Sequence, residues 1–89
     1  MAVTYNTVSV TSAATLILAS NPGRRMFVIY NNGSNAVYVG PDAAITSSNA
    51  TPILPQSSFT QNGSRMFMGA WYGVTVTGSS DVRYMDYNE

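Results

Sequence analysis

Short runs of apolar residues alternate with polar ones along this chain, and turn residues separate the runs. Val, Ile, Thr, Tyr, Phe and Trp dominate these runs, which is strand composition. The clearest strand is 24–31 (RRMFVIYN), because both of its alternating sets are apolar. One set is Met26, Val28 and Tyr30, and the other is Phe27 and Ile29. We expect this strand to be covered on both faces, by a second sheet on one and by a partner or a loop on the other.

The segment 31–35 (NNGSN) follows this strand and contains Asn-Gly, the strongest short hairpin signal, because both residues tolerate positive φ. A return strand is predicted over 36–40, which gives a β-hairpin over 24–40. A second Asn-Gly turn is predicted at 61–64.

The remaining strands are shorter. A phase slip near Asn6-Thr7 predicts a bulge or an early break in the first strand, and Pro52 confines its strand to a sheet edge or a bulge. Besides 24–31 and 36–40, strands are predicted over 3–10, 14–19, 51–54, 57–60 and 81–87. A dense apolar pattern over 65–72, followed by a clean alternation over 73–78, predicts further strand structure. About seven or eight strands of this kind predict a small antiparallel β-sandwich, jelly-roll-like, or a related barrel. The 89 residues form one domain, 1–89, with 1–10 as an N-terminal arm or an edge strand.

Charge and composition narrow the chemistry. Only 9% of residues are charged, against a typical value of about 25%, and the formal net charge is zero. His, Cys and Lys are absent, which excludes disulfides, thiolate metal sites, the usual neutral-pH base and a Schiff base. Zero net charge predicts no nucleic-acid or anionic-lipid partner. No apolar run approaches the ~20 residues of a membrane span, and the first residues do not resemble a signal peptide. We therefore expect a protein made in a cytoplasm.

Small β domains have little stability in reserve, and this chain has no disulfide to add any. Its large apolar residues exceed what one thin core holds easily: six Tyr, three Phe, five Met and one Trp. Tyr, Trp, Met and Arg are the residues enriched at protein interfaces, where Lys and Glu are depleted. Self-association and contact with neighbours are therefore expected; the alternative is a monomer with scattered surface aromatic residues.

Candidate catalytic groups are few. Asp81 and Asp86 are five residues apart on one strand, so their side chains point to opposite faces and form no carboxylate pair. Asp86 also lies in a terminal segment that we expect to fray, and Asp42 is expected to cap a turn. The sequence predicts no enzyme, no cofactor and no metal ion, with a calcium site at Asp42 or Asp81 as the open alternative. Arg24 and Arg25 are expected to form salt bridges or to reach a partner's carboxylates rather than nucleic acid.

Residues 24–40, RRMFVIYNNGSNAVYVG, resemble a pattern of small tailed-bacteriophage virion proteins, in which a strand R-R-x-Φ-x-I-x-N precedes a return G-S-N-x-V-Y-V-G. Pro52, Pro55 and 57–59 are similar to their next strand entry, and 73–76 to their closing strand. The resemblance implies a capsid decoration (cement) protein, a homotrimer of β-rich subunits on the capsid surface, with the major capsid protein as partner.

The predicted function is therefore a non-enzymatic structural one, stabilisation of the assembled phage head. The alternative is a tail- or fibre-associated adhesion domain that stacks sugar rings on exposed Tyr and Trp. The expected partner contacts combine interface-type chemistry with dense apolar strands: Arg24, Arg25, Met66, Met68, Trp71 and Tyr72.

Overall fold

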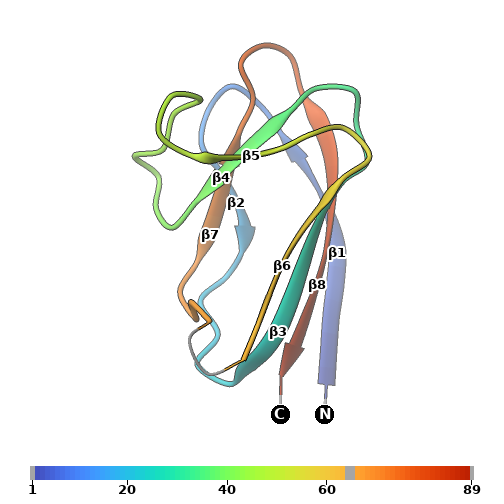
Figure 1. Ribbon diagram of the computed structural model, residues 1–89, viewed down its shortest axis with the longest axis vertical. Coiled ribbons are helices and arrows are strands. Elements are labelled where there is room, and N and C mark those ends of the chain that lie inside the picture. Colours follow the sequence, from blue (N-terminus) through green and yellow to red (C-terminus); the bar gives the residue numbers. More distant parts are fainter. Residues whose placement is uncertain (1, 64–65, 89) are drawn as a thin grey trace.

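The computed structural model describes residues 2–63 and 66–88 as two four-stranded antiparallel sheets packed face to face (Figure 1). The strands are β1 (Ala2–Val10), β2 (Thr15–Leu18), β3 (Arg24–Asn31), β4 (Val37–Gly40), β5 (Thr51–Ile53), β6 (Ser58–Asn62), β7 (Trp71–Val74) and β8 (Ser80–Asn88). One sheet has the order β1-β8-β3-β6 and the other β2-β7-β4-β5. The predicted all-β antiparallel sandwich is confirmed.

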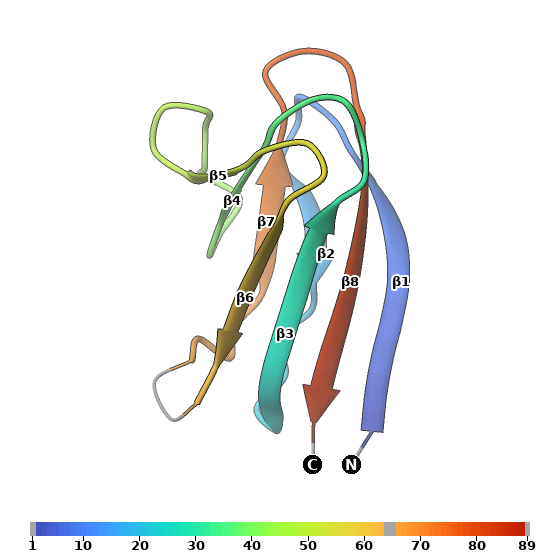
Figure 2. The ribbon, with the colours of Figure 1, turned by 45° about the vertical axis from the view of Figure 1, so that its right-hand side comes forward.

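The strand order identifies the type of sandwich. Among strands adjacent in sequence, only β4 and β5 pair with each other; every other consecutive pair lies in opposite sheets. This alternation, with β8 between β1 and β3 and β7 between β2 and β4, is the eight-stranded jelly roll. In Figure 2 the strands β6, β3, β8 and β1 lie side by side, with β1 at the margin of its sheet.

Apolar side chains from both sheets fill the space between them. The buried cluster is Val10, Ile17, Leu18, Phe27, Ile29, Val37, Val39, Ile53, Met66, Trp71 and Val82. Phe27 and Ile29 belong to this cluster, which agrees with the prediction that one alternating set of 24–31 packs against a second sheet. The strict inward phase of β3, β4 and β8 therefore follows directly from the period-2 pattern.

The predicted hairpin over 24–40 is wrong. β3 pairs with β6 and β8, whereas β4 pairs with β5 and β7 in the opposite sheet. The Asn32-Gly33 segment is a connection between sheets, and Gly33 does not have positive φ. A Cβ at Gly33 would lie 2.9 Å from the backbone nitrogen of Asp81, so the glycine permits a close approach of this connection to β8.

A buried asparagine sets the path of that connection. Asn31 is fully buried, and its amide nitrogen donates to the carbonyls of Asn35 (2.8 Å) and Ile53 (2.9 Å). Its Oδ1 accepts from the Gly33 N–H (3.0 Å) and the Ser80 hydroxyl (2.7 Å). One side chain therefore joins the ends of three strands, and these bonds favour an inter-sheet connection over a two-residue turn.

Two further strand predictions need correction. β1 pairs with β8 without interruption, so the bulge predicted near Asn6-Thr7 is absent. The alternation of apolar residues changes phase there because only the end of the strand packs on the core: Ala2–Thr7 is exposed on both faces, and Val10 alone is fully buried. A strand over 65–72 was also predicted; Arg65 lies outside the described residues, and β7 begins only at Trp71 and ends at Val74. Residues 66–70 instead form a loop.

Candidate functional site

Arg24, a predicted partner contact, is an interior residue. It is 1% exposed, and its guanidinium forms a bidentate pair with Asp86, with Nε–Oδ1 at 2.9 Å and Nη2–Oδ2 at 3.0 Å. Its other donors bond the carbonyls of Ala19, Phe67 and Gly69, so all five N–H groups have acceptors. The salt-bridge interpretation of Arg24 is confirmed, and a surface role for it is not compatible with this burial. Asp86 is likewise buried, so the expected fraying of its segment is wrong.

Met66 and Trp71 are also interior residues. Both are 7% exposed and belong to the core cluster. The Trp71 ring packs against the rings of Phe27 (5.4 Å between centroids), Phe59 (5.3 Å) and Phe67 (5.7 Å). Its buried indole Nε1 has no hydrogen-bond partner among the described residues. Both side chains therefore stabilise the fold and are not placed to meet a partner.

The remaining predicted contacts are accessible but do not share a surface. Arg25 is exposed at the irregularity between Arg24 and Met26 in β3. Met68 is 39% exposed in the β6–β7 loop, and Tyr72 is half-buried on β7 in the opposite sheet. The six predicted residues are consequently not one site.

A different surface stands out, the outer face of the β1-β8-β3-β6 sheet, which we call the outer face. The cross-strand register aligns its outward side chains in rows. The rows are Val3–Tyr87–Met26–Asn62, Tyr5–Met85–Val28–Thr60 and Thr7–Arg83–Tyr30–Ser58. Seven of these twelve side chains are aromatic or aliphatic, three of them exposed and four half-buried, and no strand of the described residues lies over them. Exposed apolar groupings of this kind mark interaction surfaces.

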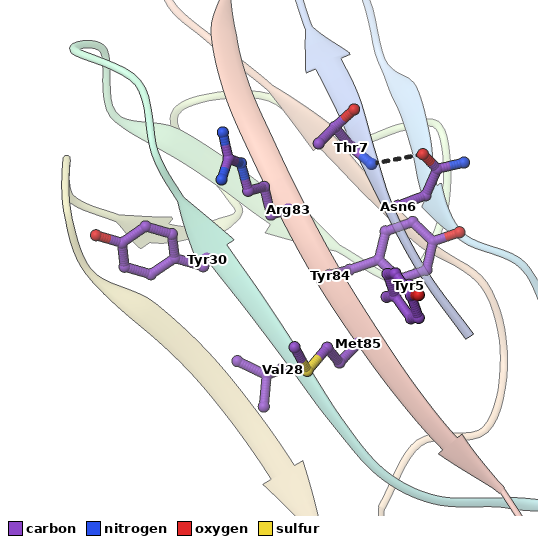
Figure 3. Close-up of a pocket in the computed structure, with 8 residues that line it drawn as sticks. All are labelled: Tyr5, Asn6, Thr7, Val28, Tyr30, Arg83, Tyr84 and Met85. Atoms are coloured by element: carbon purple, nitrogen blue, oxygen red, sulfur yellow. Dashed lines mark hydrogen bonds between the residues drawn. The ribbon is translucent and has the colours of Figure 1, made fainter. Parts of the chain in front are cut away.

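The centre of the outer face is hollowed (Figure 3). A groove of about 590 Å³ has Met85 and Val28 among its lining residues, with Tyr5 from β1 and Tyr30 from β3. Tyr5 is 72% exposed, whereas the Tyr30 hydroxyl donates to Gln56 Oε1 at 2.8 Å and is held in place. The groove is therefore an apolar depression between a fixed and a freely accessible aromatic ring.

Among the twelve side chains of these rows, only Arg83 is charged. Arg83 lies 3.4 Å from Asp81 on the same strand, and both side chains are substantially exposed. Such a pair adds little to stability and leaves this part of the face without net charge. The outer face can therefore meet another apolar, uncharged surface without burying an unpaired ion.

The sequence contained a partial signal for this surface. The doubly apolar pattern of 24–31 predicted cover on both faces without saying which set faces the core, and the structure places Met26, Val28 and Tyr30 on the outer face. The contributions of Tyr5 and Met85 were missed. Only the strand order places β8 beside β3 and β1 beside β8, and that order does not follow from the local patterns.

Groups suited to other chemistry are sparse in the described residues. Among 2–63 and 66–88, no three acidic side chains gather as a metal site would require, and no helix is long and apolar enough to cross a membrane. Asp86 borders a second hollow of about 300 Å³, but both of its carboxylate oxygens accept bonds from Arg24. Comparison with family models, curated proteins and solved structures finds no match to this chain.

Proposed function

We propose that this chain is a non-enzymatic structural protein of a phage particle, a capsid decoration protein that binds the assembled head through the outer face. The observation that carries the proposal is an open sheet surface whose centre is apolar and whose charged row residue, Arg83, is paired with Asp81. The phage context comes from the resemblance of residues 24–40 to virion proteins. The major capsid protein is the proposed partner.

The mechanism is binding linkage. A subunit that binds only the assembled shell stabilises it by RT ln(1 + [L]/Kd), and attachment to adjacent capsomers increases the effect through effective concentration. Burial of Met85, Val28 and Tyr5 supplies a non-directional driving force, since apolar area removed from water contributes roughly 25 cal/mol per Å². Because few charges lie on the outer face, binding is expected to change little with salt.

The experiment is cosedimentation with empty heads assembled without this chain. Met85→Arg places a charge at the centre of the outer face, and we expect binding about 30-fold weaker or worse, the effect of losing a buried central contact. Val76→Arg is the matched control, because Val76 is 62% exposed and lies outside the outer-face rows. Equal binding by both variants, or no cosedimentation of the unmodified chain, contradicts the proposal.

A tail- or fibre-associated glycan-binding domain is the second candidate. The observation in its favour is the groove between Tyr5 and Tyr30, because aromatic rings beside a shallow depression suit the apolar faces of sugars. Trp71, which the sequence favoured for stacking, is buried and does not serve this purpose. Binding to bacterial surface polysaccharide that is lost in Tyr5→Ala and retained in Val76→Ala supports this candidate over the first.

A further inference from the structure

The four sheet edges of this sandwich are not protected equally. β5 carries Pro52, and β2 has only four residues with a register shift between Leu16 and Leu18. β6 has five residues, whereas β1 has nine, with neither proline nor charge and with uninterrupted register against β8. Proteins usually shorten, charge or bend an edge strand to prevent pairing with another chain. β1 has none of these devices.

The hydrogen-bond pattern shows which groups β1 presents. The Asn32 N–H donates to the Asp81 carbonyl, so the odd-numbered residues of β8 face β3 and the even-numbered residues face β1. In the register between β1 and β8, even-numbered residues of β1 lie opposite even-numbered residues of β8. The even-numbered residues of β1 are therefore the ones whose backbone groups bond to β8. The backbone groups of Val3, Tyr5, Thr7 and Ser9 therefore face the open edge. Consistent with this direction, the Thr7 N–H is bonded by the side-chain oxygen of its neighbour Asn6 at 2.8 Å.

We propose that β1 pairs with β1 of a second copy, antiparallel and about a two-fold axis at Asn6. The axis aligns Ala2–Val10 of one copy with Ala2–Val10 of the other, so that their edge-facing backbone groups meet. The Thr7 N–H, which donates to Asn6 Oδ1 in the single chain, exchanges that bond for one to the backbone of the second copy. The two β1-β8-β3-β6 sheets then form one eight-stranded sheet.

A second copy is favoured by self-complementarity. Symmetric pairing brings like segments together, and a charged strand would then place like charges close to one another. Ala2–Val10 contains no charged residue, so no like-charge repulsion opposes the contact. Side chains at paired positions share a face, and Tyr5 on the outer face would lie beside Thr7 of the second copy. The outer faces of the two copies therefore become continuous.

This contact goes beyond the proposed function, because it needs no shell and forms between copies of the chain alone. A two-fold contact closes at two copies, unlike the trimer that the family resemblance implies. It also supplies bivalency, since one dimer presents two outer faces in a single sheet.

The first test is the mass of the protein in solution over a range of concentrations, by sedimentation equilibrium. The unmodified chain should form a dimer, and Thr7→Pro should weaken the dimer at least about tenfold, because proline removes an edge-facing N–H and obstructs pairing. Thr60→Pro is the matched control. Thr60 lies on β6, the opposite edge of the same sheet, and the bond from the Asn31 N–H to the Ser57 carbonyl implies that its N–H also points away from β3.

The second test uses the absence of cysteine in the chain. In the proposed register Asn6 faces Asn6 of the second copy as a non-hydrogen-bonded pair with Cα atoms about 4.5 Å apart, which a disulfide can span. Asn6→Cys should therefore form a disulfide-linked dimer under mild oxidation, whereas Thr60→Cys should not.

The outcomes separate the alternatives. A monomer at all concentrations, or equal effects of Thr7→Pro and Thr60→Pro, overturns the β1 contact. A trimer unaffected by Thr7→Pro also overturns it and favours the arrangement that the resemblance implies. A dimer with no binding to empty heads supports the contact while contradicting the proposed function. Circular dichroism of each proline variant establishes that the sandwich is intact, and the cysteine test decides the contact if Thr7→Pro does not fold.

Discussion

Arg24 and Asp86 form a bidentate ion pair that connects the first residue of β3 with the C-terminal end of β8, 62 residues later in the chain. The Arg24 side chain is fully buried, and the carboxylate of Asp86 is nearly so. The guanidinium also binds the carbonyls of Phe67 and Gly69 and lies 5.3 Å from the Phe27 ring centroid. The hydrogen bonds of Arg24 thus hold the β6–β7 loop against the end of the sandwich.

Removing either partner leaves a buried charge. We expect Arg24→Met and Asp86→Leu each to lower the free energy of unfolding by about 3–5 kcal/mol, and the double variant to lose much less than the sum. Urea denaturation at low temperature measures all three. The exposed pair Arg83–Asp81 is the control, for which Arg83→Met should cost at most about 1 kcal/mol. Additive losses at Arg24 and Asp86 would contradict the coupling.

Arg24→Lys tests geometry separately from charge. Lysine keeps the positive charge but has neither the planar fork nor five donors, so the carbonyls of Ala19, Phe67 and Gly69 cannot all be bonded. We expect a loss of about 1–3 kcal/mol in the free energy of unfolding, the cost of buried groups left without partners. Arg83→Lys, at an exposed position where lysine keeps the charge facing Asp81, should change it by less than about 0.5 kcal/mol. Equal stability of the two lysine variants would show that charge alone matters at Arg24.

The opposite end of β3 depends on Asn31. Asn31→Asp replaces the amide nitrogen with an oxygen that faces the carbonyls of Asn35 and Ile53. We expect this substitution to lower the free energy of unfolding by at least about 3 kcal/mol, since two bonds are lost and a carboxylate is buried. Asn49→Asp is the control, because this exposed side chain accepts from the Thr46 N–H through Oδ1, which aspartate preserves. Thermal unfolding of both variants is the measurement.

The sequence predicts the inward phase of the strands well and their connections poorly. Phe27, Ile29, Val37 and Val39 are buried as their alternation requires, because a one-residue slip would expose them all. The hairpin predicted from Asn32-Gly33 is wrong because a hairpin turn and a connection between sheets use the same residue types. The difference arises from Asn31 and Ser80, which are 49 residues apart and hydrogen-bonded only in the folded chain.

Three of the six predicted contact residues are buried, for a related reason. Composition selects residue types that are common at interfaces, but Trp71 and Arg24 also suit an interior when rings or carboxylates are available there. Tyr5 and Met85 become one surface only because β8 inserts beside β1. Local patterns contain no information on that pairing, whereas the doubly apolar pattern of β3 already predicted cover on both of its faces.

Glycine substitutions test the inter-sheet connection directly. A Cβ at Gly33 would meet Ser80 and the backbone of Asp81, so Gly33→Ala must move β8 or the connection itself. A Cβ at Gly23 would meet Asn21 Oδ1 at 3.7 Å, an ordinary contact, and Gly23 does not have positive φ. We expect Gly33→Ala to lower the free energy of unfolding by about 1–3 kcal/mol, the usual cost of overpacking. Gly23→Ala should be neutral or stabilise by up to about 1 kcal/mol, because alanine restricts the unfolded chain. The free energies of unfolding come from urea denaturation, and hydrogen exchange of the Asp81 backbone amide reports on the contact itself. Equal stability of the two alanine variants, or an exchange rate at Asp81 that Gly33→Ala leaves unchanged, would show that the 32–35 connection does not pack against β8.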